Sequence, residues 1–185
     1  IEQDVFLGAT KLLLHLDGKN PSDEFEDSSF YYNKNQPIDT DGDVSASTTE
    51  KQLGVGSAEF DGDSGFLTVP DSDNWDFDSG DFTIDFWVKF KVLPVSGSMA
   101  GIYSQRQNAN HMVSAALLND GSGTLKWSFN IEDGSTSTTI LAPTTLGSNW
   151  YHIAYVRKGN NLKIFQGGSS LPTTGSLSGS MPSLN

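Results

Sequence analysis

The sequence predicts an all-β fold, a sandwich of two antiparallel sheets, on three observations. Apolar and polar residues alternate over residues 82–90, as in a half-buried strand. Similar segments recur along the chain, and clusters of Gly, Asn, Asp and Ser such as residues 119–123 separate them. No segment shows the ten-residue helical pattern that alternates with strands in an α/β fold.

The first third of the chain is predicted to hold little regular structure. Residues 11–16 form a short apolar run that is expected to be a strand and to end at the turn of residues 17–21. A polar loop rich in Asp, Ser and Asn is expected to follow as far as residue 52.

The later strands are predicted from turn signals and alternation. Phe60 and residues 66–69 are expected to pair as a hairpin around the Gly/Asp turn of residues 61–65. One helical turn is expected near residues 71–76. The remaining predicted strands are residues 82–92, 101–105, 112–118, 124–131, 137–141, 150–158 and 161–166.

Alternation also assigns the two faces of the strand that begins at Phe82. One face should carry Phe82, Ile84, Phe86, Val88 and Phe90, and the other Thr83, Asp85, Trp87 and Lys89. Trp87 and Trp150 both lie in strand alternation, so both are predicted to be core residues, which requires a second layer over Trp87.

Charge and composition limit the classes of partner. The 185 residues include 11 Lys and Arg against 23 Asp and Glu, a formal net charge of −12, which disfavours nucleic acid and anionic membranes. An acidic surface suits calcium and neutral sugars, and solubility alone is the other interpretation. The absence of cysteine excludes disulfides and thiolate metal sites. No run approaches the roughly eighteen apolar residues of a membrane helix, so membrane insertion is not expected.

Four stretches carry a family resemblance. They include Leu-Leu-Leu-His-Leu-Asp-Gly at residues 12–18 and Trp-Tyr-His-Ile-Ala-Tyr-Val-Arg at residues 150–157, with residues 60–72 and 75–88 between them. In order and spacing they resemble the laminin-G-like, concanavalin A-like lectin/glucanase domain found in phage and marine bacterial proteins. The resemblance implies a two-sheet jelly-roll sandwich that mostly holds glycans or other proteins.

The resemblance also sets the expected domain organisation. It implies one laminin-G-like jelly-roll domain over residues 1–166, followed by a Gly/Ser-rich tail over residues 167–185 that is a loop or an incomplete closing segment. Similar proteins usually have an Asp-Gly turn where this chain has Gln166-Gly167-Gly168, and their closing strand with its acidic pair is not evident before Asn185. A partner chain or a missing segment is therefore expected to cover the open edge.

The sequence does not predict an enzyme. A glucanase of this fold needs two carboxylates on one strand face, in the order Glu-x-Asp-x-x-Glu, and the chain has no such run. His15, His111 and His152 lack the spacing of a zinc site, and His152 falls in an apolar strand pattern that favours a structural role. A non-catalytic domain is therefore expected, with a glycoside hydrolase of the same fold as the less favoured alternative.

Calcium is the one cofactor predicted. The resemblance implies a carboxylate ligand for a structural calcium at Asp17, with its partner acid in the closing segment. Asp39, Asp41 and Asp43 alternate around Gly42, but the distal bidentate Glu of a calcium loop is missing, so a solvated turn is the favoured interpretation there.

Aromatic and polar residues outside the predicted core are the candidate ligand site. Sugars offer C–H faces that stack on rings and hydroxyl groups that bond short polar side chains. Trp75 lies in an Asp-rich loop, where it either stacks on a ligand or anchors the loop. The most polar ring-bearing segment adds the other candidates, which are Tyr103, Gln105, Arg106, Asn108, Asn110 and His111.

The main hypothesis is a non-catalytic glycan- or protein-binding module of an extracellular or virion assembly. A phage structural or receptor-binding component fits best, with a glycan or host-surface receptor and neighbouring protein subunits as partners. The alternative is a purely structural protein that decorates or cements a particle through protein contacts, for which an interface of roughly 1,000 Å² or more is expected.

Overall fold

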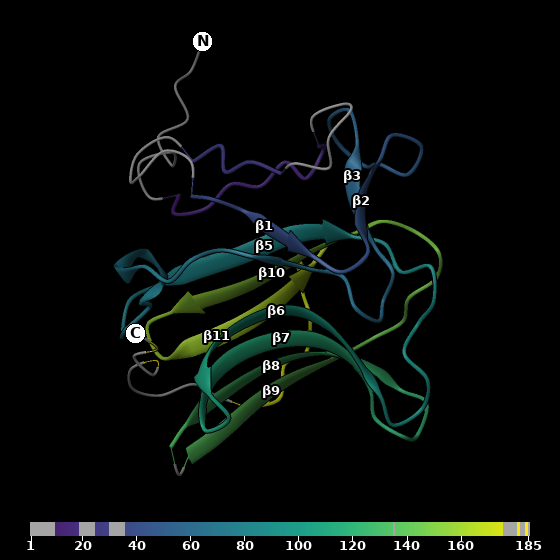
Figure 1. The fold of residues 1–185 in the computed structure, drawn as a ribbon. Helices are drawn as coiled ribbons and strands as arrows, with labels where there is room; N and C mark the ends of the chain where they lie inside the picture. The colour runs from purple at the N-terminus through teal and green to yellow at the C-terminus, as the bar shows by residue number, and fades with distance from the viewer. Residues whose placement is uncertain are drawn as a thin grey trace. The chain divides into compact units, whose positions relative to one another are not determined.

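The computed structural model describes residues 10–18, 25–29, 36–134, 136–175, 181 and 184 (Figure 1). The chain divides into two compact units, Ile1–Trp75 and Asp76–Asn185. Among the described residues, no helix is long and apolar enough to cross a membrane.

The first unit contains two small antiparallel sheets. Strand β1 (Asp39–Asp41) pairs with β4 (Phe66–Thr68), and β2 (Val44–Ser47) pairs with β3 (Ser57–Phe60). The expected hairpin between Phe60 and residues 66–69 is therefore wrong, because each segment pairs with a strand from the predicted polar loop. The predicted helical turn is confirmed as the 3-10 turn η1 (Asp73–Trp75).

Two glycines allow this pairing. A Cβ atom on Gly42 would lie 2.3 Å from the carbonyl oxygen of Ser64, and one on Gly65 would lie 2.4 Å from that of Asp43. The turn that follows β1 and the turn before β4 thus approach each other so closely that only glycine, which has no Cβ atom, fits at these two positions. The second turn is fixed by the Asp61 carboxylate, which accepts backbone N–H bonds from Asp63, Ser64 and Gly65.

The predicted strand at residues 11–16 is wrong. The described residues there form a single bridge, Leu14 to Asp27. The Asp27 carboxylate is buried and accepts hydrogen bonds from the backbone N–H groups of Leu13 and Ser29 and from the Ser29 hydroxyl. A side chain therefore satisfies the backbone donors that a sheet neighbour would otherwise take.

The second unit consists of two four-stranded antiparallel sheets (Figure 1). One has the order β12-β11-β10-β5 and the other β6-β7-β8-β9. Their bounds are β5 Phe82–Val88, β6 Met99–Asn108, β7 His111–Asn119, β8 Leu125–Asp133, β9 Thr136–Thr144, β10 Tyr151–Lys158, β11 Asn161–Gln166 and β12 Ser169–Ser170. The predicted fold class, an all-β two-sheet jelly-roll sandwich, is confirmed.

The core of the second unit lies between its two sheets. Phe129 and Trp127 from β8 and Tyr155 from β10 are fully buried, and the rings of Phe129 and Tyr155 lie 5.4 Å apart. Phe82 adds a ring 6.1 Å from Phe129. These contacts join the two sheets into one apolar layer, as strand alternation requires.

Strand β5 has the predicted alternation. Phe82, Ile84, Phe86 and Val88 are partly buried on the core face, and the residues between them, Thr83, Asp85 and Trp87, are exposed. The prediction that Trp87 is a core residue is wrong, because its side chain remains 40% exposed. Trp150 is partly buried just before β10.

The tail of residues 167–185 packs on the second unit over the part that the structure describes. Gln166 pairs with Ser169, so Gly167 and Gly168 alone form the turn into β12, and both have positive φ angles, +57° and +78°. Thr174 exchanges two backbone hydrogen bonds with Leu141 of β9, 2.7 and 3.0 Å long. Met181 and Leu184 are buried in the core. The tail therefore adds two apolar side chains to the core and short stretches of strand pairing with β11 and β9. The domain boundary at residue 166 stays a prediction.

Replacing Tyr155 with phenylalanine should leave the stability unchanged or raise it slightly. Burial raises the pKa of Tyr155, and its hydroxyl has no hydrogen-bond partner among the described residues. Removing a buried hydroxyl without a partner removes a desolvation cost of about 1–3 kcal/mol. Thermal melting checks this, with Tyr103→Phe as the control because the Tyr103 hydroxyl donates to Gln105. A Tyr155→Phe variant that melts well below the control would contradict the assignment.

Candidate functional site

Three of the predicted ligand residues meet at the end of the β6–β7 hairpin. Asn108 Oδ1 accepts a bond from the backbone N–H of Asn110 at 2.8 Å and lies 3.3 Å from His111 Nδ1. The carbonyl of Asn110 accepts the backbone N–H of Gly134, in the β8–β9 turn, at 2.7 Å. Hydrogen bonds thus link the two turns, and they engage several polar groups of these residues within the hairpin ends.

The other three candidates on this hairpin do not share one face. Tyr103 and Gln105 pair across the sheet with Ala115 and Val113, which are buried, so both point toward the core. The Tyr103 hydroxyl donates to Gln105 Oε1 at 3.2 Å, and burial raises the pKa of Tyr103 to about 12. Arg106 pairs with Met112 on the opposite face. The structure therefore brings together only part of the predicted set, and its ligand role stays a prediction.

Trp75 lies in the first unit, at the end of η1. Its ring is partly buried, and its indole Nε1–H donates to the carbonyl of Pro70 at 2.9 Å. This bond closes the loop of residues 70–75. Of the two roles that the sequence allowed for Trp75, ligand stacking and loop anchoring, it is the arrangement expected for an anchor.

Asp17 also lies in the first unit. A Cβ atom on Gly54 would lie 3.6 Å from its carboxylate oxygen Oδ2, so the side chain faces this glycine turn. Within the described ranges, no group of three or more His, Asp or Glu side chains could hold a metal ion. Calcium needs six to eight oxygen ligands, so these residues do not fit a calcium site on their own.

Added calcium should accordingly leave the melting temperature of this chain unchanged, because one carboxylate cannot hold the ion without several other oxygen ligands. Melting curves recorded with millimolar calcium and with a chelator check this. A marked rise in melting temperature that Asp17→Asn abolishes would contradict it and establish a calcium site at Asp17.

The outer face of the β5–β10–β11 sheet carries an aromatic and polar cluster that the sequence analysis missed. Trp87 of β5 pairs with His152 of β10, and their ring centroids lie 5.2 Å apart at an interplanar angle of 35°. His152 Nε2 lies 3.0 Å from Asp85 Oδ2, so the carboxylate fixes the imidazole ring. The sequence signal was present, because alternation places Trp87 and Asp85 on one face of β5 and the register adds His152.

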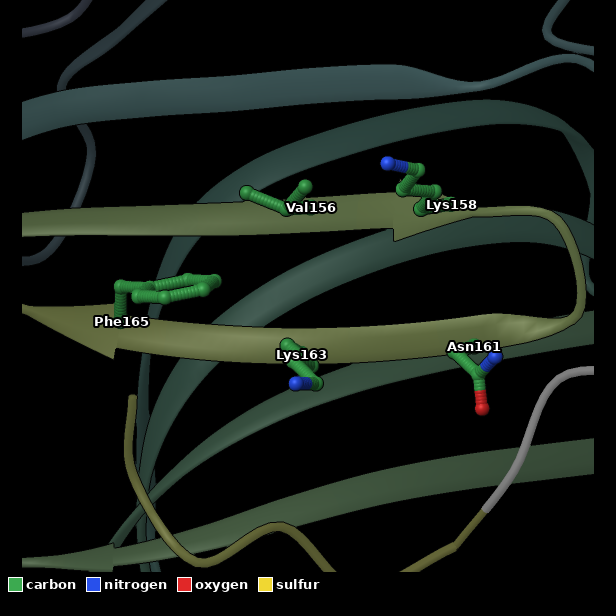
Figure 2. Close-up of a pocket in the computed structure, with 5 residues that line it drawn as sticks. All are labelled: Val156, Lys158, Asn161, Lys163 and Phe165. Atoms are coloured by element: carbon green, nitrogen blue, oxygen red, sulfur yellow. The ribbon is translucent and has the colours of Figure 1, made fainter. Parts of the chain in front are cut away.

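The same face continues into a hollow on β10 and β11. Its volume is about 550 Å³, and Figure 2 shows the described side chains that line it, which are Val156, Lys158, Asn161, Lys163 and Phe165. All five alternate with buried core residues, so they belong to the outer face. Across the two strands, Val156 pairs with Lys163, and Lys158 pairs with Asn161. Phe165 pairs with Ala154, which on its other side pairs with Asp85 of β5. We call this outer face, from Trp87 to Asn161, the β5–β11 face.

The β5–β11 face has two chemically different ends. Trp87 and His152 offer ring surface beside a carboxylate at one end, and the hollow offers two lysines and an amide at the other. The arrangement can stack an apolar face of a ligand and bond its polar groups, which is how concave sites with a few placed polar groups recognise small ligands.

Comparison with known proteins identifies the family. Residues 61–183, more than half of the chain, match the laminin G family model that is described as the concanavalin A-like lectin/glucanases superfamily. No curated protein and no solved structure matches the chain. The matched residues include the strands from β4 to β12. The chain therefore belongs to the concanavalin A-like lectin/glucanase superfamily, as a laminin-G-like domain.

Proposed function

We propose that this protein is a non-catalytic glycan-binding module and that the β5–β11 face is its binding surface. The observation that carries the proposal is the Trp87 ring, 40% exposed on a regular strand and held against His152. A large aromatic ring left exposed gives up the free energy of its burial, about 1.5–3 kcal/mol for a large apolar side chain, unless a ligand covers it. The family supports binding of carbohydrate or protein in general terms.

The non-catalytic assignment is supported by the missing Glu-x-Asp-x-x-Glu run, and three of the described carboxyl groups lack the raised pKa of a catalytic acid. A glycoside hydrolase uses one carboxylic acid with a raised pKa as the general acid. Hydrogen bonds instead hold the pKa values of three carboxyl groups below their ordinary range. The main donor to Asp61 is the backbone N–H of Asp63, and the main donor to Asp120 is the Lys126 ammonium group. The main donor to Glu132 is the side-chain amide of Asn130.

The setting that we propose is an extracellular or virion assembly, in which the module is a phage structural or receptor-binding component. Its partners are then a host-surface glycan and neighbouring protein subunits, and a calcium ion at Asp17 would take its remaining ligands from a neighbouring subunit. The resemblance of residues 12–18 to the opening of this domain in phage and marine bacterial proteins supports this setting.

Screening the protein on a glycan array tests the function, followed by titration of the strongest ligand into variants. Trp87→Ala should weaken binding by about tenfold or more, since ring contacts contribute about 0.5–1.5 kcal/mol beyond the area they bury. Trp87→Phe should retain part of the affinity. Phe66→Ala, an exposed ring of the first unit, is the matched control and should bind as the unaltered protein does.

A Trp87→Ala variant that binds its glycan with unchanged affinity would contradict the assignment of the face. Absence of binding to every glycan on the array would contradict the function itself. Thermal melting of each variant separates lost binding from lost folding.

A specific observation favours the second candidate, a structural protein that acts through protein contacts. The loop between β5 and β6 exposes Val92 and Val95 to 80% and 71%, and Met99, the first residue of β6, is 70% exposed. The loop is nevertheless held in place, because Asn119 Nδ2 donates to the carbonyl of Pro94 and Ser96 donates to that of Gly121. Apolar side chains presented on a fixed loop are typical of a contact with another protein.

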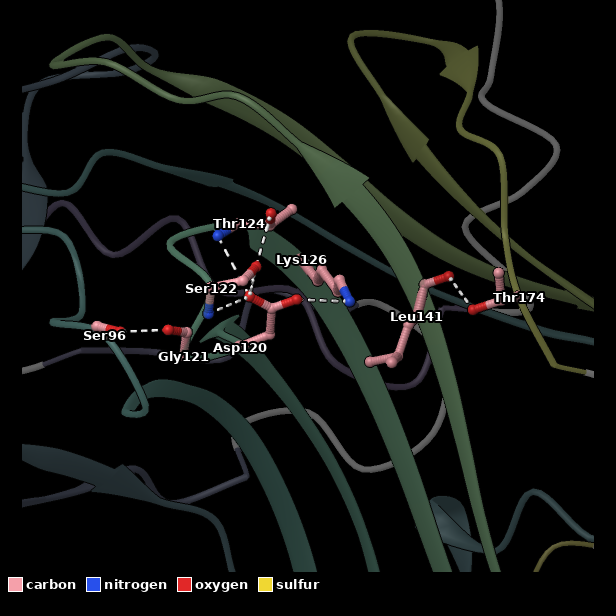
Figure 3. Close-up of polar contacts among 8 residues, drawn as sticks. All are labelled: Ser96, Asp120, Gly121, Ser122, Thr124, Lys126, Leu141 and Thr174. Atoms are coloured by element: carbon pink, nitrogen blue, oxygen red, sulfur yellow. Dashed lines mark hydrogen bonds and ion pairs between the residues drawn. The ribbon is translucent and has the colours of Figure 1, made fainter.

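Figure 3 shows why this loop is fixed. The Asp120 carboxylate accepts bonds from Ser122 and Lys126, 2.6 and 2.8 Å long, and so stiffens the turn that receives Ser96. Sedimentation of the intact assembly with a Val92→Ser/Val95→Ser/Met99→Gln variant tests this candidate. Loss of the chain from the assembly supports it, and full incorporation contradicts it.

A further inference from the structure

We propose that the hollow on β10 and β11 binds the anionic group of an acidic sugar, a carboxylate or a sulfate ester. It thereby selects charged over neutral glycans. The inference rests on the proposed glycan-binding function and names the ligand class that the β5–β11 face prefers.

The geometry gathers two cations in one concave place. Lys163 and Asn161 lie two residues apart on β11 and therefore point to the same side, about 7 Å from each other. Lys158 on β10 pairs directly with Asn161. Figure 2 shows both lysines on the two neighbouring strands, with Val156 between Lys158 and the Phe165 end of the hollow.

The charge of the hollow is opposite to that of the chain. None of its five described lining residues carries a carboxylate, although the protein as a whole has a formal net charge of −12. In the part of the chain that the structure describes, no ion pair engages Lys158 or Lys163. Lys126, by contrast, is paired with Asp120 at 2.8 Å. The two ammonium groups would attract an anion in the hollow.

The hollow lies on the same face of the sheet as the aromatic end. His152 and Val156 lie four residues apart on β10, about 13 Å along the strand. Between them on β10 lies Ala154, which pairs with Asp85 on one side and Phe165 on the other, and its small methyl group is buried between its neighbours. A short oligosaccharide stacked on Trp87 could therefore extend along the face and place an acidic unit between the lysines.

The rings favour a sugar over an acidic peptide as the occupant. Phe165 lines the hollow and Trp87 lies on the same face, so the anion site is flanked by surfaces on which sugar C–H faces stack. A purely ionic partner would not need these rings, and an acidic peptide is therefore an outcome of the test.

Titration calorimetry with matched probes tests the inference. The probes are an oligogalacturonate and its methyl ester, a sulfated galactan oligosaccharide and its desulfated form, and a polyglutamate peptide. The unaltered protein should bind at least one acidic glycan about tenfold more tightly than its neutral counterpart, and added salt should weaken that binding. The carboxylate and sulfate arms identify which anionic group is preferred.

Two double variants separate the hollow from net charge. Lys158→Gln/Lys163→Gln should remove the preference for the acidic probe, while Lys51→Gln/Lys91→Gln makes the same change in net charge outside the hollow and should retain it. Equal affinity for acidic and neutral glycans overturns this inference and leaves the proposed function standing. Polyglutamate binding as tightly as the acidic glycan overturns the assignment to a sugar. Absence of binding to all of these probes and to every glycan on the array overturns both proposals.

Discussion

Replacing Phe129 with alanine should lower the free energy of unfolding by about 3–5 kcal/mol. The Phe129 side chain is fully buried between the two sheets of the second unit, and its ring contacts those of Phe82 and Tyr155. Its removal takes away apolar contacts from both sheets and leaves a cavity that regular strands cannot easily fill. Chemical denaturation monitored by tryptophan fluorescence measures the loss.

Phe66→Ala is the matched control for this core prediction. Phe66 is 52% exposed on β4, so the same deletion should cost less than about 1 kcal/mol. If Phe129→Ala cost no more than Phe66→Ala, the two sheets would not share the core described for them.

Replacing Arg157 with methionine should cost about 2–5 kcal/mol. Arg157 is buried on the core side of β10, where Nε donates to the carbonyl of Gly159 and Nη1 to that of Asp78, both at 2.9 Å. Asp78 has a positive φ angle of 40° and also accepts the backbone N–H of Met181. The guanidinium therefore holds a strained residue that joins β10 to the tail.

Lys158→Met is the control for Arg157→Met, because it changes the adjacent exposed side chain and should alter the unfolding free energy little. Equal melting temperatures for the two variants would contradict the structural role of Arg157. Methionine preserves much of the apolar stem, so the comparison isolates the lost hydrogen bonds.

The strands of the second unit could be predicted because their signal is local. In β5, Phe82, Ile84 and Phe86 alternate with Thr83 and Asp85, and the eight residues of β10 are rich in aromatic and aliphatic side chains. Glycine and asparagine turns mark the ends, as at Gly159, which has a positive φ angle. Such patterns depend only on neighbouring residues, so one sequence is enough to recognise them.

The strands of the first unit could not be predicted in the same way. β1 and β2 are three and four residues long, and β1 consists of the exposed residues Asp39, Thr40 and Asp41. Their pairing depends on the close approach of Gly42 and Gly65 to distant carbonyl groups, which no local pattern reports. The tail presents the same difficulty, since Met181 and Leu184 join the core from a segment of turn-forming residues.

The candidate site was only partly accessible from the sequence. Alternation placed Trp87 opposite Phe86, but it could not tell whether a further layer covers that face, and the ring is exposed. On β6, irregularities in register lie between Gly101 and Tyr103 and between Arg106 and Asn108. Each inserted residue changes the face on which the next side chains lie, so polar residues close in sequence are separated in space.

The most direct measurement of the central claim is nuclear magnetic resonance of the four tryptophan indole N–H groups during titration of the best glycan ligand. The chain has four tryptophans, and single substitutions assign their signals. We expect the Trp87 signal to shift with bound glycan, while those of the buried Trp127 and of Trp75, bonded to Pro70, stay in place. A shift of the Trp75 signal, or of the Asn108 and Asn110 amide signals, with an unchanged Trp87 signal would contradict binding on the β5–β11 face.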